Sequence, residues 1–232
     1  MKFYKALTIC LLFFPLLFCQ LLPQLSMQNA MAETQGEKLP WDKLYEKEPP
    51  RKEETGGSRG AVELCTISPE SLSGEEIRIW SDRPLFIWQG NVSKIQIRRR
   101  RTGQVLWSQK LTANNNSVMY SGPPLQPGES YDWVLLKSND DIDSFQVSFQ
   151  VIPAEERDRI TADLNKLEKQ LQQEGATPEK IAYAKANYFA ERQMWPDVLQ
   201  SAYEVKNPSE ALTKFIQKIP QQFCKPLATI RM

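Results

Sequence analysis

The sequence predicts an α+β chain in which an antiparallel β-sandwich over residues 61–152 is followed by a small α-helical bundle over residues 153–232. In the first region, short apolar runs alternate with turn signals at spacings of roughly ten residues, as in sandwiches. In the second region, apolar residues recur at helical spacing from Ile160 onward. The pairs Thr177-Pro178 and Asn207-Pro208 each place a capping side chain before a proline, which favours helix starts there.

The predicted strands are separated by turn signals rich in Gly, Pro and Asn, such as Gln89-Gly90-Asn91 and Gly122-Pro123-Pro124. Within the runs, apolar residues take alternate positions, as Ile95 and Ile97 do, which places them on one face of a strand. The expected strands cover residues 77–80, 85–88, 92–99, 105–107, 118–120, 131–135 and 145–152.

Four helices are expected after residue 153. The first carries a stripe formed by Ile160, Leu164, Leu167 and Leu171, and Gly175 suits its end. The second begins after Thr177, the third covers 197–205, and the fourth runs from Asn207 to near Pro220. These signals predict a compact helical segment behind the sandwich.

The composition excludes several classes of protein. The chain has 232 residues, with 29 Lys and Arg against 28 Asp and Glu, so it lacks the global positive charge of many nucleic-acid binders. It contains no histidine, which excludes a Ser-His-Asp triad, a Cys-His pair and any His-ligated metal. We therefore expect no cofactor, no metal site and no nucleic-acid partner.

The N-terminus has the features of an export signal. Lys2 and Lys5 precede a long apolar run, and residues 6–32 carry no charge. Ala30-Met31-Ala32 supplies the small-x-small pattern of a cleavage site, so that Glu33 would begin the mature chain. This predicts a signal peptide over residues 1–32 and a periplasmic or extracellular protein.

Two alternatives remain for this segment. It is retained as a membrane anchor if cleavage fails, although Pro15 interrupts a run that is marginal in length for a span. Lipid attachment at Cys19 is the other alternative, and the bulky Phe18 before it argues against that processing.

Residues 33–60 are expected to form a flexible linker, because they are rich in Lys and Glu and offer little apolar surface to offset ordering entropy. After removal of the signal, only Cys65 and Cys224 remain, and two cysteines in an exported chain of this size predict one disulfide. The alternative is two unrelated buried thiols.

One stretch resembles a known family of sandwiches. Residues 125–133 (Leu-Gln-Pro-Gly-Glu-Ser-Tyr-Asp-Trp) are similar to the approach to the sixth strand in fibronectin type III and immunoglobulin-like domains. The resemblance implies that Tyr131 forms a tyrosine corner, with its hydroxyl bonded to backbone upstream. It carries no implication for activity, because this fold hosts many functions.

Two further resemblances concern larger parts of the chain. Residues 188–208 are similar to part of a tetratricopeptide repeat (TPR), without a second copy, so we expect a TPR-like hairpin pair. The mature chain also resembles an exported cyanobacterial family of unknown function, through Gly57–Gly60 before Cys65, the run 82–88 and the 125–133 motif. That resemblance implies secretion and a non-enzymatic domain.

Two surface features are candidate binding sites. The first is an anion patch of consecutive basic residues near a strand end, formed by Lys94, Arg98, Arg99, Arg100 and Arg101. A solvated hairpin tip, whose like charges discourage edge pairing, explains the same residues. The second is a sugar-stacking pair, Trp80 and Trp107, among aromatics that otherwise suit a sandwich core.

The sequence thus favours an exported, non-enzymatic binding or scaffolding protein whose helical part presents an apolar groove to a protein partner. The first alternative is a carbohydrate- or envelope-binding module that uses Trp80, Trp107 and the arginines 98–101 to bind glycan or lipid. A hydrolase that uses carboxylates alone is the second alternative, and no motif supports it.

Overall fold

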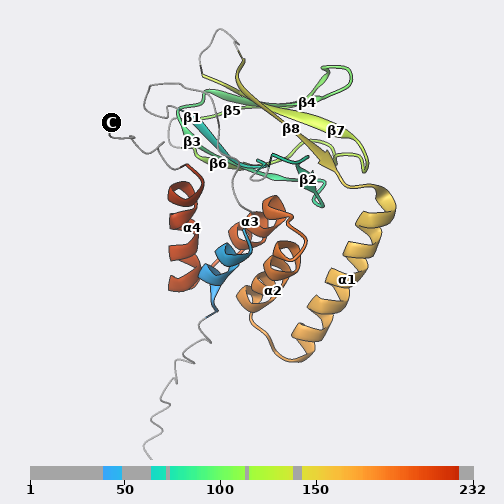
Figure 1. The fold of residues 1–232 in the computed structure, drawn as a ribbon, viewed down its shortest axis with the longest axis vertical. Coiled ribbons are helices and arrows are strands. Elements are labelled where there is room, and N and C mark those ends of the chain that lie inside the picture. Colours follow the sequence, from blue (N-terminus) through green and yellow to red (C-terminus); the bar gives the residue numbers. More distant parts are fainter. Residues whose placement is uncertain (1–38, 49–63, 72–73, 113–114, 138–142, 225–232) are drawn as a thin grey trace, which may run out of the picture. The chain divides into compact units, whose positions relative to one another are not determined.

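The computed structural model describes residues 39–48, 64–71, 74–112, 115–137 and 143–224 (Figure 1). In this part of the chain, a β region made of two sheets precedes a segment of four α-helices, so the α+β class is confirmed. The strands are β1 (Leu64–Ser68), β2 (Arg78–Ile79), β3 (Leu85–Gly90), β4 (Lys94–Arg99), β5 (Val105–Lys110), β6 (Ser117–Met119), β7 (Ser130–Leu136) and β8 (Asp143–Val151). The helices are α1 (Ala154–Gln173), α2 (Pro178–Ala190), α3 (Trp195–Tyr203) and α4 (Glu210–Phe223).

The smaller sheet has the order β1-β3-β6, and the larger has the order β2-β8-β7-β4-β5. All pairings are antiparallel except that of β2 with β8, which is parallel, so the expectation of a purely antiparallel sandwich is wrong at this edge. The reason lies in the path of the chain. After β1 in one sheet, the chain crosses to the edge of the other, where Arg78 and Ile79 align with the end of β8.

The strand β3 is buried on both faces. Phe86 and Trp88 belong to a hydrophobic cluster built from both sheets, and the ring centroids of Phe86 and Trp133 are 5.2 Å apart. Leu85 and Ile87 point the other way, into a cluster formed mainly by helical residues. The continuous apolar run of this strand therefore follows from its position between the sandwich core and the helices.

The helices begin close to their expected positions. Thr177 caps α2, where its hydroxyl accepts a hydrogen bond from the Lys180 N–H at 3.2 Å. The cap of α4 is Ser209, whose hydroxyl accepts from the Leu212 N–H at 3.3 Å, and not the expected Asn207. In α1, the first half of the apolar stripe is buried and the second half is half-buried.

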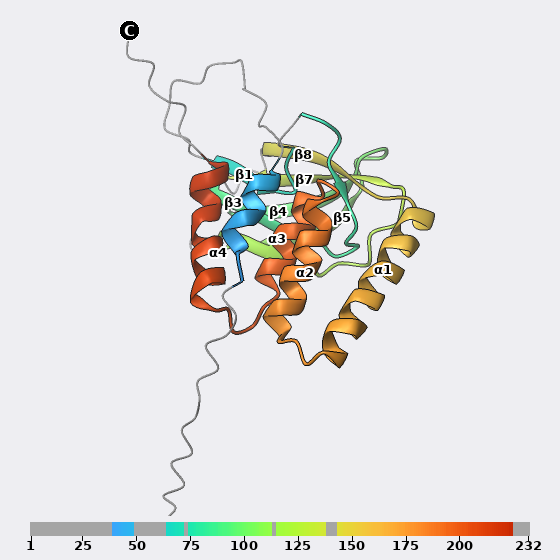
Figure 2. The same ribbon diagram turned by 60° about the horizontal axis from the view of Figure 1, so that its bottom comes forward.

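The expected flexible linker over residues 33–60 is wrong for part of its length. Trp41–Lys47 forms a 3-10 helix, η1, in which Trp41 and Leu44 are each 1% exposed. Figures 1 and 2 show this blue segment beside the helices, and it contacts α2 and α4. Its order comes from these distant contacts, which the local Lys- and Glu-rich composition does not reveal.

The predicted disulfide is confirmed. Cys65 in β1 and Cys224 after α4 are bonded, with their Cα atoms 6.0 Å apart. The expected signal peptide and its cleavage point between Ala32 and Glu33 lie outside the described residues. Among the helices that the structure describes, none has the length and apolar content to cross a membrane.

Candidate functional site

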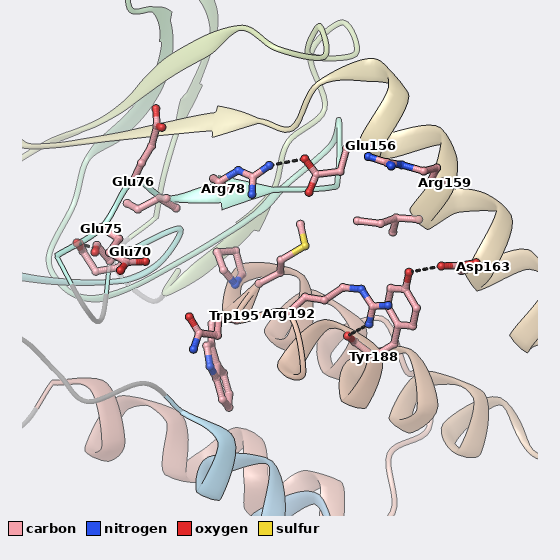
Figure 3. A pocket seen from close by; sticks show the side chains of 16 residues that line it. Glu70, Glu75, Glu76, Arg78, Glu156, Arg159, Asp163, Tyr188, Arg192 and Trp195 are labelled. Atoms are coloured by element: carbon pink, nitrogen blue, oxygen red, sulfur yellow. Dashed lines mark hydrogen bonds and ion pairs between the residues drawn. The ribbon is translucent and has the colours of Figure 1, made fainter.

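A cleft of about 510 Å³ lies where the strand region meets the helices (Figure 3). Its walls come from three parts of the chain: residues 70–71 and 75–78 around the start of β2, residues 156–163 of α1, and residues 188–196, which join α2 to α3. Eight of its sixteen lining residues are charged, so this cleft suits polar ligands better than apolar small molecules.

The charges are unevenly distributed. Glu70, Glu75 and Glu76 lie on the side of the loop before β2, whereas Arg159 and Arg192 come from the helical side (Figure 3). The loop wall is thus acidic, whereas the helical wall carries two guanidinium groups together with the carboxylates of Glu156 and Asp163. A ligand with both signs of charge fits this arrangement by Coulomb attraction at each wall.

Some of the charged groups are used internally. Arg78 of β2 forms an ion pair with Glu156 of α1, which ties the two walls together at one end. The Tyr188 hydroxyl donates a hydrogen bond to the Asp163 carboxylate at 2.7 Å. The Arg192 guanidinium lies 3.5 Å from the centroid of the Tyr188 ring. Burial, assisted by the bond to Asp163, raises the pKa of Tyr188 to about 12, so the phenol stays protonated at neutral pH.

Other charged groups are not used internally. The side chains of Glu75, Glu76 and Arg159 form no hydrogen bond or ion pair with any residue in the described part of the chain. All three are exposed, so they remain hydrated and available for a ligand. We call these three residues the open charges of the cleft.

Four buried apolar side chains also line the cleft: Ile77, Ile160, Met194 and Trp195. The indole N–H of Trp195 has no hydrogen-bond acceptor among the residues described. An apolar surface together with charged walls provides both contact area and orientation for a ligand. No cluster of three or more Cys, Asp or Glu side chains suited to a metal ion occurs in the described ranges.

The expected anion patch does not form one surface. Lys94 and Arg98 lie on the outer face of β4, where Arg98 donates a hydrogen bond to the Gln96 side chain at 2.7 Å. Arg99 lies on the face of the buried Ile97, where it is half-buried, whereas Arg100 and Arg101 are exposed in the following turn. The alternation of the strand divides the five basic residues between two faces and a turn.

The expected stacking pair is also not brought together. Trp80 packs against the helices: its indole N–H donates to Thr161 at 3.0 Å and its ring lies 5.6 Å from that of Phe189. Trp107 belongs to the other hydrophobic cluster, where its ring contacts Tyr120 at 5.2 Å. The two rings therefore serve separate cores and do not form a shared platform.

The contact expected for Tyr131 is present: its hydroxyl accepts a hydrogen bond from the Gln126 backbone N–H at 2.8 Å. By contrast, the helical part, expected to present an apolar groove to a partner, carries no exposed large apolar side chain on its described helices. The exposed large apolar side chains of the described residues are Val105, Met119 and Phe145, and all three lie on strands. The described helices therefore carry no exposed apolar stripe.

Sequence patterns do not identify the cleft. Glu75 and Glu76 show no paired spacing with another acid, and Arg159 is one of many charges on α1. The cleft joins residues more than a hundred positions apart, so no local motif marks it. Comparison with protein-family models and with curated proteins finds no match for the chain. The function of the cleft must therefore be inferred from its own geometry and charge.

Proposed function

We propose that the protein is an exported, non-enzymatic binding protein that holds a charged segment of a protein partner in the cleft. The observation that carries this proposal is the set of open charges of one cleft, Glu75 and Glu76 from the loop before β2 and Arg159 from α1, together with a buried apolar lining. Leaving such charges unpaired brings the fold no internal stabilisation, whereas a partner with complementary charges gains both specificity and association rate.

A peptide segment fits this cleft better than other ligands do. Apolar small molecules need an apolar pocket, and half of the lining here is charged. A glycan platform would need exposed aromatic rings, and Trp80 and Trp107 are packed in separate cores. A peptide offers both signs of charge together with apolar side chains for Ile160 and Met194.

Further support concerns fold and location. The orders β1-β3-β6 and β8-β7-β4-β5 match strands A-B-E and G-F-C-C′ of fibronectin type III and immunoglobulin-like sandwiches, and the Tyr131 bond matches their tyrosine corner. We propose this sandwich type for the β region.

The apolar N-terminal run, which carries no charge over residues 6–32, and the Cys65–Cys224 bond favour export, since disulfides persist in oxidising compartments.

The test is cross-linking and capture of the full chain, expressed with its own N-terminus in its native envelope. We compare the wild type with Glu75→Lys/Glu76→Lys and with Arg159→Glu, each of which reverses one wall. Recovery of a protein partner is expected to fall about tenfold or more in both variants, because each loses charge pairs worth about 1.4 kcal/mol or more. The capture is also expected to weaken with added salt.

The matched control is Arg101→Glu, which reverses an exposed charge that lines neither the cleft nor the adjoining cavity shared by Glu75, Glu76 and Arg100. This variant is expected to retain the partner. Equal recovery from the wild type and both cleft variants would contradict the proposal. If only the Arg101→Glu variant lost its ligand, and that ligand were polysaccharide or lipid and not protein, an envelope-binding module would be favoured instead.

A further inference from the structure

The 3-10 helix η1 lies beside α2, α3 and α4, which are far from it along the chain (Figure 2), and it contacts all three. Trp41 contacts the ring of Tyr183 at 5.2 Å and that of Phe215 at 5.5 Å. Tyr45 stacks on Phe215 at 4.7 Å and, nearly parallel, on Trp195 at 6.4 Å. Two aromatic side chains therefore anchor the segment, and the surface that receives them is called the α2–α4 groove below.

Polar contacts fix the orientation of the segment in the groove. The Trp41 indole N–H donates to the Glu179 carboxylate at 3.0 Å, and the Tyr45 hydroxyl donates to the Phe215 carbonyl at 3.1 Å. Glu179 also accepts from the backbone N–H and the hydroxyl of Ser209, both at 2.7 Å, so its position is held from the side of α4.

Each end of η1 carries a charge that pairs with an opposite charge on the helices. Asp42 near the start of the segment forms an ion pair with Lys218 of α4, at 3.0 Å. Lys47 at its end pairs with Glu191 at 3.2 Å and donates to Asn187 at 2.7 Å. The groove thus offers a cation to one end of its occupant and an anion to the other, which specifies direction as well as sequence.

The segment has little helical stability of its own. It has seven residues, no side-chain cap at Pro40, and a 3-10 geometry that is uncommon beyond about four residues. Isolated helices shorter than about 12 residues are marginal in water. Its conformation therefore depends on the groove, as that of a peptide ligand does when an amphipathic helix enters a groove.

The connection to the rest of the fold allows release. Residues 49–63 join the segment to β1, and a chain of this length spans ~50 Å when extended. The segment pairs with no described strand, so its departure removes no strand pairing. Tethering keeps the segment at an effective concentration of about millimolar, which favours the filled groove until a competitor arrives.

We propose that the α2–α4 groove is a peptide-recognition site that residues 41–47 occupy as an internal ligand, and that a protein partner displaces them with a segment of the same chemistry. The segment of the partner would begin with an aromatic residue in the place of Trp41. Counted from that residue, an acid would follow at the next position, an apolar residue at the third, a second aromatic at the fourth and a lysine at the sixth. This site shares Trp195 with the cleft, but its test uses a different probe and does not depend on the function of the cleft.

The test uses the full chain and a fluorescent synthetic peptide of residues 39–48 as the probe. Wild-type protein is expected to bind it weakly, because its groove is filled. The variant Trp41→Ala/Tyr45→Ala empties the groove and is expected to bind the peptide at least tenfold more tightly. A peptide with Trp41→Ala is expected not to bind.

A charge exchange separates recognition from a merely structural role. In the emptied variant, Lys218→Glu is expected to weaken binding of the natural peptide about fivefold, and a peptide with Asp42→Lys is expected to restore it. Lys166→Glu on α1, outside the groove, is the matched control and leaves binding unchanged. The proposal would be overturned if the affinity for the peptide changed neither with Lys218→Glu nor with the compensating Asp42→Lys peptide.

A second measurement covers the case in which the emptied variant does not fold. A protease site is placed within residues 49–63 of the wild type, the chain is cut, and the labelled peptide is added. Exchange of the cut segment for the peptide supports the proposal, whereas a cut segment that never exchanges is a fixed part of the fold and overturns it. Wild-type dimers that trade segments between two copies would also overturn it, since the occupant would then be a second copy.

Discussion

The carboxylate of Asp197 accepts the backbone N–H of Ser81 at 3.0 Å, and its other oxygen accepts that of Trp80 at 2.9 Å. One side chain in the first turn of α3 thus satisfies two consecutive amides after β2. Asp197 is only 2% exposed, so water does not replace these bonds. This carboxylate is one of the polar connections between the strand region and the helices close to the cleft, and the most deeply buried of those among the described residues.

Replacement of Asp197 by Ala is expected to lower the free energy of unfolding by about 2–4 kcal/mol, because it leaves two buried N–H groups without an acceptor. Asp197→Asn retains one acceptor oxygen and is expected to cost less. Urea denaturation of the three proteins measures the difference. Asp158→Ala, at an exposed site on α1, is the control and is expected to change stability by less than about 0.5 kcal/mol.

The stability contributed through Asp197 depends on pH. Burial raises the pKa of this carboxyl from 3.8 to about 7, although the hydrogen bonds from Trp80 and Ser81 oppose the shift. Between these values the folded state binds a proton that the unfolded state releases, so the free energy of unfolding falls as pH rises from about 4 to 7.

Urea titrations at pH 4.5 and 7.5 test this dependence against Asp197→Asn, which has no proton to release. The wild type is expected to lose stability relative to the variant over this interval, on the order of a few kcal/mol. A difference between the two proteins that stays constant with pH would show that Asp197 does not titrate in this range.

Removal of the Cys65–Cys224 bond is expected to destabilise the fold by about 2–5 kcal/mol, since it closes a loop of 159 residues in sequence separation. Thermal unfolding of the wild type with and without reductant measures the effect, and a Cys65→Ala/Cys224→Ala variant is expected to be insensitive to reductant. Free-thiol labelling of the oxidised mature protein is expected to find none; two reactive thiols would contradict the pairing.

Tyr131→Phe removes the hydroxyl that accepts from the Gln126 N–H and is expected to cost about 1 kcal/mol. The control is Tyr203→Phe, because the Tyr203 hydroxyl forms no hydrogen bond within the described residues. Chemical denaturation compares the two variants. Equal effects would mean that the loss at Tyr131 arises from packing and not from the corner bond.

The sequence predicts those elements that depend on local signals. The helices follow from a regular stripe such as that of α1 and from the Thr177-Pro178 cap, both of which act within a few residues. Seven of the strands, β2 to β8, follow from short apolar runs that are bounded by turn residues. The pairing of Cys65 with Cys224 follows from counting, because only two cysteines remain after the expected signal.

The remaining features depend on contacts between distant residues. The strand β1 (Leu-Cys-Thr-Ile-Ser) lacks a clear alternation, and its pairing with β3 defines it. The helix η1 is ordered by Tyr183 and Phe215, more than 130 positions away. The cleft brings together single charges from three stretches of chain, and Asp197 acquires its role only by burial against the strand region.

The bond between Cys65 and Cys224 also makes a covalent ring of all residues between them, which includes the strands β2 to β8 and the helices α1 to α4. A single proteolytic cut within that ring opens the chain but yields no separate fragments. The nicked molecule keeps both new ends attached, so the pieces stay at high local concentration and can refold together. Such a protein persists after a proteolytic cut that would divide a linear chain.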